Sequence, residues 1–401
     1  MGMLQINKQS CILLFSLLVA SINFATFFEL STLYIHIELL VFSLILIYLA
    51  LSGSDVRADA GFGIVSAVFL FVLVINMLRA GPEAVFSSAN FILNLYAIPA
   101  LAYLIGSSFR KAELGTVFRT AFSVLAPIAL VIYYFFASDD YDFAGTLATG
   151  SVFGGVMSLY ALIFASMLRG SKSKTDFFLF IISILLLILS EHRTGMLALA
   201  ISLSVLFGYS PRRSRSGNGI VLVTLGLIYV FVFALAAYLF PPLLSKLFFY
   251  DEVALENLNT AGRANVWIML YDEWTKDVLS FLFGGGLGHA TKTIATHFPD
   301  ALEAIAVPHN EWLRLGLDLG MLGIAIYVTF LKKIIGFSLL RIRNPIALAF
   351  AVHVFVEMMF SNAIFWAGSY LFILVIWCAA MAHPVQATGC TSKPALRLCG
   401  S

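Results

Sequence analysis

The sequence predicts an all-α polytopic membrane protein with about twelve transmembrane helices. Hydrophobic residues make up 61% of the 401 residues and charged residues only 11%, whereas an ordinary soluble domain carries about 25% charge. The apolar residues occur in runs of about 14 to 21, long enough to cross or nearly cross the hydrocarbon core as helices. Lysine and arginine gather in alternate loops between these runs, as they do in multi-pass membrane proteins.

The apolar runs follow one another without a soluble domain between them, so we expect one transmembrane domain over 1–381 and a short cytoplasmic tail over 382–401. The first run has a weakly basic start and no small-residue cleavage site, which predicts an uncleaved first span. The predicted spans cover 11–30, 33–51, 61–78, 90–107, 118–137, 151–168, 177–190, 195–208, 220–240, 316–331, 344–360 and 363–381.

The positive charges predict the orientation. With the N-terminus in the cytoplasm, most of the 24 lysine and arginine residues fall in cytoplasmic loops or the tail. Outside, apart from a long loop over 241–308 between spans nine and ten, only Arg79, Arg193 and Arg314 remain. Because short cytoplasmic loops collect cations, both termini are predicted to be cytoplasmic. None of the four cysteines lies in an outer loop, so no structural disulfide is expected.

The outer loop over 241–308 is long enough to carry structure of its own. Part of it predicts an amphipathic helix on the membrane surface. Thr260 as its N-cap would place Arg263 in the first turn, where a cation opposes the helix dipole, and where free N–H groups and a guanidinium suit an anionic ligand. The apolar residues that repeat at helical spacing are Val266, Trp267, Leu270, Tyr271, Trp274 and Val278.

A glycine cluster, Gly284-Gly285-Gly286-Leu287-Gly288, follows in the same loop. It could cradle a phosphate or form a turn that packs closely against its neighbours. No strand precedes it and no Gly-Lys-Ser/Thr follows it, which favours the turn.

Arg193 lies between two short apolar runs, 177–190 and 195–208. Each run rises only about 21 Å as a helix, against a hydrocarbon core of about 30 Å. The turn that carries Arg193 is therefore expected below the outer surface of the membrane. There Arg193 either neutralises Glu191 or faces a water-filled cavity.

His309 opens a polar stretch that leads into span ten. A helix N-terminus favours the neutral imidazole, so His309 could act as a general base, or it could cap or pack the helix. Asn310 and Arg314 are possible supporting residues on the same helix. Arg314 could instead pair with Glu311 or Asp318.

Span eleven carries His353 and Glu357, four residues apart and hence on one face. Pairing with each other inside the bundle would account for both. Glu357 is also a possible supporting residue of a site at the outer end of the span.

Arg193, Arg263 and His309 are all predicted on the outer face. Two fixed cations and a neutral base suit transfer from a diphosphate donor, in which the arginines hold the pyrophosphate and the base takes a proton from the attacking hydroxyl. No cluster of histidine and carboxylates with metal-ligand spacing occurs outside, so no metal and no cofactor is predicted.

With these residues the chain resembles the O-antigen ligase and O-antigen polymerase superfamily of bacterial envelope glycosyltransferases. The resemblance rests on Arg193-Thr-Gly-Met-Leu197, on Gly262-Arg263 with Trp267, and on His309 followed after ten residues by Gly320. In sequence it covers about 190–330, and before that only the layout of the spans agrees.

The resemblance implies a metal-independent enzyme with a GT-C-like fold in the bacterial inner membrane, active on the periplasmic face. Its donor would be an undecaprenyl-diphosphate-linked glycan, with the pyrophosphate on Arg193 and Arg263 and the acceptor activated by His309. The acceptor would be another lipid-linked glycan in a polymerase, or lipid A-core in a ligase, and the stretch over 308–315, Pro-His-Asn-Glu-Trp-Leu-Arg-Leu, slightly favours the polymerase. The lipid bilayer is a further partner, and no nucleic acid is expected.

A secondary transporter is the alternative from another class, because twelve spans are common there. The long loop, however, follows span nine instead of separating two six-span halves. The 52–59 loop also lacks the basic Gly-x3-Asp-Arg pattern of major facilitators, and no paired broken helices occur in matching halves.

Overall fold

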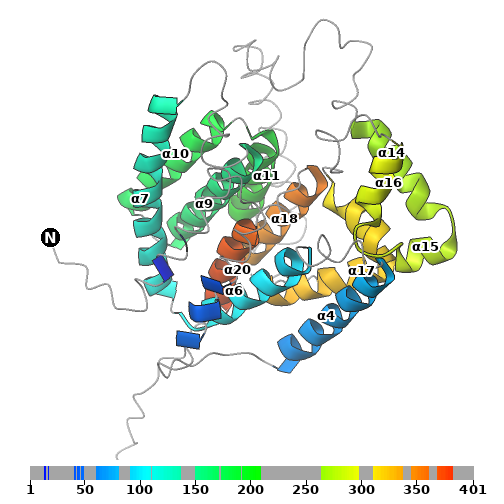
Figure 1. Cartoon of the computed structure of the whole chain (residues 1–401). Helices are drawn as coiled ribbons and strands as arrows, with labels where there is room; N and C mark the ends of the chain where they lie inside the picture. The colour runs from blue at the N-terminus through cyan, green and yellow to red at the C-terminus, as the bar shows by residue number, and fades with distance from the viewer. Residues whose placement is uncertain are drawn as a thin grey trace, which may run out of the picture.

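The computed structural model is a helical assembly (Figure 1). It describes residues 60–80, 91–109, 111–136, 150–170, 173–190, 192–208, 263–297, 310–336, 345–360 and 368–382, with a few further positions between 13 and 48. Regular structure in these ranges is helical throughout, with no strand, so the all-α prediction is confirmed for them.

Most of the predicted spans that fall on described residues coincide with helices to within a few residues. The predicted span over 220–240 lies outside the described residues, that over 11–30 lies almost entirely outside, and that over 33–51 lies mostly outside. The described helices are α4 (Ala60–Ala80), η2 (Leu93–Ala97), α6 (Ile98–Ser107), α7 (Lys111–Phe136), α9 (Gly150–Gly170), α10 (Lys174–Leu189), α11 (Arg193–Gly208), α14 (Arg263–Thr275), α15 (Val278–Phe283), α16 (His289–His297), α17 (Glu311–Ile335), α18 (Pro345–Phe360) and α20 (Gly368–Ala382).

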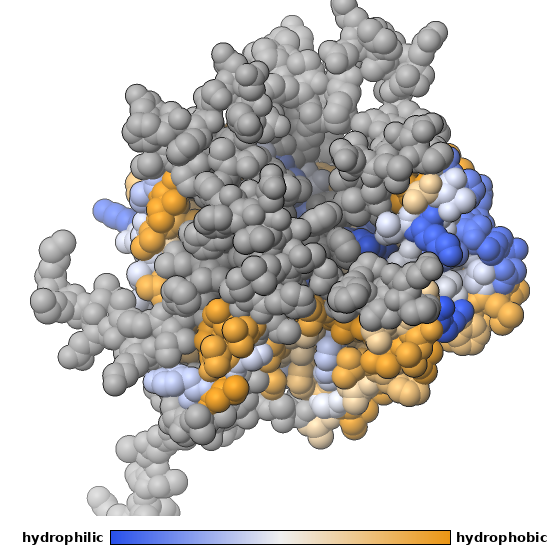
Figure 2. Space-filling model, viewed as in Figure 1, coloured by the Kyte–Doolittle hydropathy of each residue, from blue (hydrophilic) through white to orange (hydrophobic). Residues whose placement is uncertain are grey.

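Two of the described helices, α4 and α17, are long and apolar enough to cross a bilayer, and several shorter helices are also apolar. Helix α4 exposes Ile64, Val68, Phe71 and Leu78, which recur at spacings of three, four and seven along one face. Hydrophobic residues gather over this side of the molecule, whereas hydrophilic ones gather over α14 and α16 (Figure 2). An exposed apolar helix face of this kind suits contact with lipid.

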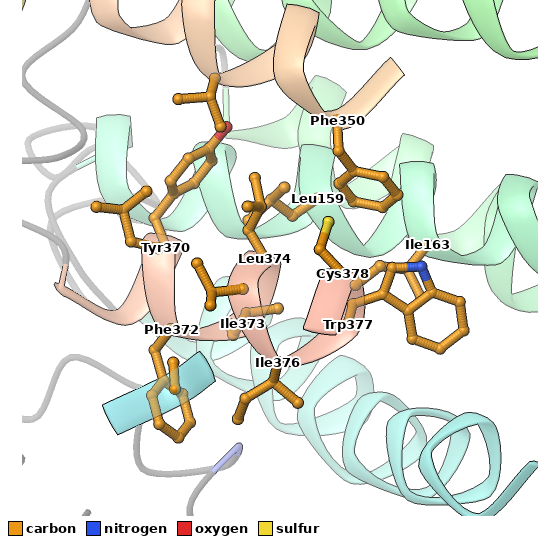
Figure 3. Packing of buried hydrophobic residues seen from close by; sticks show 14 of the residues in the cluster. Leu159, Ile163, Phe350, Tyr370, Phe372, Ile373, Leu374, Ile376, Trp377 and Cys378 are labelled. Carbon is orange, nitrogen blue, oxygen red and sulfur yellow. The ribbon is translucent and has the colours of Figure 1, made fainter. Parts of the chain in front are cut away.

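The main hydrophobic core is centred on α20, whose side chains from Tyr370 to Ala379 are buried (Figure 3). Helix α6 packs closely on α20, because a Cβ atom on Gly106 would lie 2.7 Å from the carbonyl oxygen of Ile376. On another side the Trp377 ring meets the Phe118 ring of α7 edge-on, with centroids 5.4 Å apart. Contact with several helices at once explains why α20 lacks the polar face of a surface helix.

Helix α17 begins at the Asn310 cap and is broken by a kink. Gly320 has φ 71° and ψ 180°, a backbone conformation essentially restricted to glycine. The glycine segment 284–288 docks at this kink, where the N–H groups of Gly285 and Gly286 donate to the carbonyl oxygens of Leu317 and Asp318 at 2.7 and 3.0 Å. The segment that carries α14 to α16 is thereby fixed to α17.

The predicted amphipathic helix in the outer loop is shorter than its apolar repeat suggested. Helix α14 ends at Thr275, and the Asp277 side chain caps a new helix, α15, so that Val278 belongs to α15. Val266 and Leu270 are buried in a small second core that α16 and α17 complete. One face of α14 therefore packs on protein, whereas Ile268 and Tyr271 are exposed.

Candidate functional site

The described residues of the three motifs include the first residues of two helices and the cap of a third. Arg193 is the first residue of α11 and Arg263 is the first residue of α14. Asn310 is the N-cap of α17, and its side chain accepts a hydrogen bond from the Leu313 N–H at 3.0 Å. His309, directly before it, lies outside the described residues. The Thr260 cap predicted for α14 lies outside them as well.

The start of α11 is joined to the C-terminal end of α18. The Thr194 hydroxyl, next to Arg193 in the sequence, donates a hydrogen bond to the carbonyl oxygen of Phe360 at 3.3 Å. Phe360 is the last residue of α18, where carbonyl oxygens have no partner within the helix. The Thr194 hydroxyl satisfies one of these oxygens and fixes the two helix ends side by side.

The starts of α14 and α17 reach the same part of α18. The Trp267 ring, one turn after Arg263, lies 6.4 Å from the Phe360 ring. The Trp312 ring lies 5.3 Å from the Phe355 ring, and its N–H approaches the carbonyl oxygen of Phe355 at 3.4 Å. The last two turns of α18 thus gather the three helix starts that carry the sequence motifs.

The gathered helix starts create a place that favours negative charge. The first N–H groups of a helix point outward without intrahelical partners, and the aligned peptide dipoles add about half a positive charge there. Helices α11, α14 and α17 each begin within one or two turns of a contact with Phe355 or Phe360. A phosphate group is the kind of ligand that helix N-termini bind.

Arg314 is buried and pairs within α17. Its Nε lies 3.9 Å from Oδ2 of Asp318, and its guanidinium lies 5.0 Å from the centre of the Phe91 ring. The other carboxylate oxygen of Asp318 accepts a hydrogen bond from the Ala290 N–H at the start of α16, at 2.9 Å. Of the two interpretations of Arg314, this geometry favours the structural one, because the Arg314 and Asp318 side chains link α17 to α16 and to Phe91.

The proposed pairing of His353 with Glu357 is wrong for the described structure. His353 Nε2 lies 3.1 Å from the Ser158 hydroxyl of α9, and the Glu357 carboxylate lies 4.0 Å from His192 Nε2 in the turn before α11. All four side chains are buried. Residues four apart on a helix share a face but need not bond to each other, and here each meets a different neighbouring helix or turn.

The glycine segment does not form a phosphate loop. The N–H groups of Gly284, Gly285, Gly286 and Leu287 all donate to backbone carbonyl oxygens, at 2.7 to 3.2 Å. A loop that cradles a phosphate needs these groups free to point at the ligand. Arg79 completes the packing, because its guanidinium donates to the carbonyl oxygens of Phe283 and Gly284 at 2.9 Å each. The prediction of a closely packed turn is confirmed.

A groove of about 430 Å³ on the α14 and α16 side is acidic and unsuited to a diphosphate. The Lys276 ammonium donates a hydrogen bond to the Glu273 carboxylate and holds the pKa of that carboxyl below its usual value, so Glu273 is ionised at neutral pH. Within the described ranges, no three of histidine, cysteine, aspartate and glutamate lie together as they would around a metal ion. The lining residues of the groove are Ile268, Met269, Asp272, Glu273 and His297.

Sequence reasoning missed several residues that shape the site. Phe355 and Phe360 carried no polar signal within an apolar run. His192 is adjacent to Arg193 in the sequence, but its partner Glu357 lies far along the chain.

Comparison with known proteins supports the family. Residues 178–328 match the family model described as O-antigen ligase. The match spans Arg193, Arg263 and His309 together with Gly320, so the predicted similarity to the O-antigen ligase and polymerase superfamily is confirmed over this region. A comparison with curated proteins gives no match.

Proposed function

We propose that the chain is a glycosyltransferase of the bacterial inner membrane that polymerises undecaprenyl-diphosphate-linked oligosaccharide repeat units on the periplasmic face. The observation that carries the proposal is the convergence of α11, α14 and α17 on the last turns of α18, because each of these helices begins at or beside one motif residue. The family match over 178–328 supports a glycosyltransferase-like reaction.

In this mechanism Arg193 and Arg263 bind the pyrophosphate of the donor, supported by the N-terminal dipoles of their helices. His309 takes the proton from the acceptor hydroxyl as its oxygen attacks the anomeric carbon. The bond from that carbon to the phosphate oxygen breaks, and undecaprenyl diphosphate leaves with the electron pair. The two arginines stabilise the charge that develops on the leaving group.

A ligase that transfers the finished glycan to lipid A-core is the second candidate, favoured by the description of the matching family model. The lipopolysaccharide banding of a deletion strain separates the two. Core carrying one repeat unit indicates an O-antigen polymerase, and bare core with accumulated lipid-linked polymer indicates a ligase. Normal lipopolysaccharide with a lost capsule or exopolysaccharide indicates a polymerase for that polymer.

Two substitutions test the catalytic assignment. Replacing His309 by alanine removes the base and should lower the transfer rate by about 10²–10⁴-fold. Replacing Arg193 by alanine removes a charge from the leaving group and should lower it by about 10²–10³-fold. Transfer is measured in membrane vesicles with purified lipid-linked donor, after normal insertion of each variant has been checked.

His297→Ala is the matched control, because His297 lies on α16 in the predicted outer loop over 241–308 and lines the acidic groove. It should transfer glycan at the normal rate. Full activity in His309→Ala or Arg193→Ala would refute the assigned mechanism.

A further inference from the structure

The buried pair formed by His192 and Glu357 has no part in the proposed chemistry, yet it adjoins Arg193. His192 is 8% exposed and Glu357 is fully buried, and His192 Nε2 lies 4.0 Å from Glu357 Oε2. Neither oxygen of Glu357 has a hydrogen-bond partner among the described residues. A buried carboxyl group adds little to apolar packing, so its presence requires another explanation.

The hydrogen bond on the other side of the His192 ring shows which way the ring acts. The Gly195 N–H donates to His192 Nδ1 at 3.2 Å. A ring nitrogen that accepts a hydrogen bond carries no hydrogen, so in the neutral ring the hydrogen lies on Nε2, which faces Glu357. His192 thus caps α11 in the way that a serine or aspartate side chain commonly caps a helix.

Two glycines form a tight seat for the ring. A Cβ atom on Gly154 of α9 would lie 2.1 Å from His192 Cβ, and one on Gly195 would lie 2.6 Å from His192 Nδ1. Any larger residue at either position would occupy the space of the ring. The seat and the Gly195 hydrogen bond hold the imidazole in one orientation, with Nε2 toward α18.

We propose that Glu357 and His192 are positioning residues that hold the first turn of α11, and with it Arg193, in the conformation that binds the donor pyrophosphate. The Glu357 carboxylate, 4.0 Å away, attracts the Nε2–H of His192 electrostatically toward α18. The opposite side of the ring, Nδ1, accepts the hydrogen bond from the Gly195 N–H. The Thr194 bond to Phe360 fixes the same turn to the same helix, so α18 orients Arg193 from two points. The role toward pyrophosphate rests on the proposed function, whereas the capping of α11 does not.

Amide hydrogen exchange in lipid nanodiscs tests the capping. His192→Ala and Glu357→Gln should both speed exchange in the first turn of α11, 193–197. His192→Asn should retain protection, because asparagine is a good N-cap and can accept from the Gly195 N–H. Ser202→Ala, which removes a buried hydroxyl further along the same helix, is the matched control and should leave exchange in this turn unchanged.

Binding of undecaprenyl diphosphate to the same nanodiscs tests the positioning of Arg193. Loss of a cap typically changes an equilibrium about fivefold, so His192→Ala should weaken binding about fivefold, and Glu357→Gln should weaken it by less, because His192 still caps α11. His192→Asn should restore most of it, a rescue that a general loss of folding would not show. The Ser202→Ala control should bind as the unchanged protein does.

Unchanged exchange at 193–197 in both His192→Ala and Glu357→Gln would overturn the inference. So would faster exchange with unchanged affinity for undecaprenyl diphosphate, because the pair would then serve stability alone. If the unchanged protein does not bind undecaprenyl diphosphate, the proposed function fails, and faster exchange in the variants would still establish the capping of α11.

Discussion

Two charged side chains near the candidate site, those of Arg314 and Asp318, are held by protein partners. Arg314 is buried against Asp318 and the Phe91 ring, and Asp318 also caps α16. In the sequence, Arg314 lies just before predicted span ten and Asp318 lies near its start. Their partners indicate that their role is to fix α17 to its neighbours.

Removal of one member of this pair should destabilise the protein more than removal of both. Breaking a buried ion pair by deleting one partner typically costs about 3–5 kcal/mol, whereas replacing both by apolar residues is often nearly neutral. We therefore expect Asp318→Leu to lower the melting temperature of the detergent-solubilised protein strongly. The double variant Arg314→Leu/Asp318→Leu should recover part of that loss.

The recovery in the double variant is the informative measurement. Thermal unfolding followed by size-exclusion chromatography gives the melting temperatures of Arg314→Leu, of Asp318→Leu and of the double variant. Additive losses would mean that the two side chains do not interact, contrary to the 3.9 Å separation of Nε and Oδ2.

Among the elements, α17 positions the outer-loop helices because of its kink. Gly320 and Gly284 both have positive φ, near 70°. A Cβ atom on Gly284 would clash with the backbone N of Gly320, and one on Gly320 would clash with the backbone next to Gly284. A Cβ atom on Gly320 would lie 2.4 Å from the carbonyl group of Leu282. The two segments approach so closely only because neither residue has a side chain.

Gly320→Ala should therefore separate the outer-loop helices from α17. The conformation costs a non-glycine residue about 1–3 kcal/mol, and the clash with Leu282 adds to it. We expect a lower melting temperature, faster proteolysis within 263–297 and reduced glycan transfer.

Gly63→Ala is the matched control for Gly320→Ala, because a Cβ atom on Gly63 meets nothing within 4 Å. Alanine favours a helix interior over glycine by about 1 kcal/mol, so this variant should be as stable as the unchanged protein or slightly more stable. Equal stability of Gly320→Ala and Gly63→Ala would show that the kink does not need glycine.

The sequence predicts the apolar helices well and the site only in part. The runs over 61–78 and 344–360 match α4 and α18 closely, because hydropathy changes abruptly at both ends of these helices. The break between α14 and α15 was not predicted, since Val278 continues the apolar repeat and only the Asp277 cap ends it. The meeting of three helix starts at Phe355 and Phe360 depends on packing between distant segments, which no local pattern encodes.

At the scale of the whole molecule, contacts join helix ends that the charge distribution predicts on one side of the membrane. Arg79 at the end of α4 reaches Phe283, and Thr194 at the start of α11 reaches Phe360. At the opposite end of α10 from His192, Arg119 pairs with Asp176 through two hydrogen bonds, on the side predicted to be cytoplasmic. The contact predicted to be outside and the pair predicted to be cytoplasmic thus lie at opposite ends of α10, as the predicted orientation requires.

Two cysteine substitutions in a cysteine-free background test the orientation. Ala295, exposed on α16, is predicted to be periplasmic, and Lys332, exposed in the last turn of α17, is predicted to be cytoplasmic. In spheroplasts a membrane-impermeant maleimide should label Ala295→Cys and not Lys332→Cys, because the charged reagent does not cross the bilayer. Both should be labelled after permeabilisation, which controls for accessibility. Labelling of Lys332→Cys alone in intact spheroplasts would invert the topology and place Arg193 and Arg263 on the face away from a periplasmic donor.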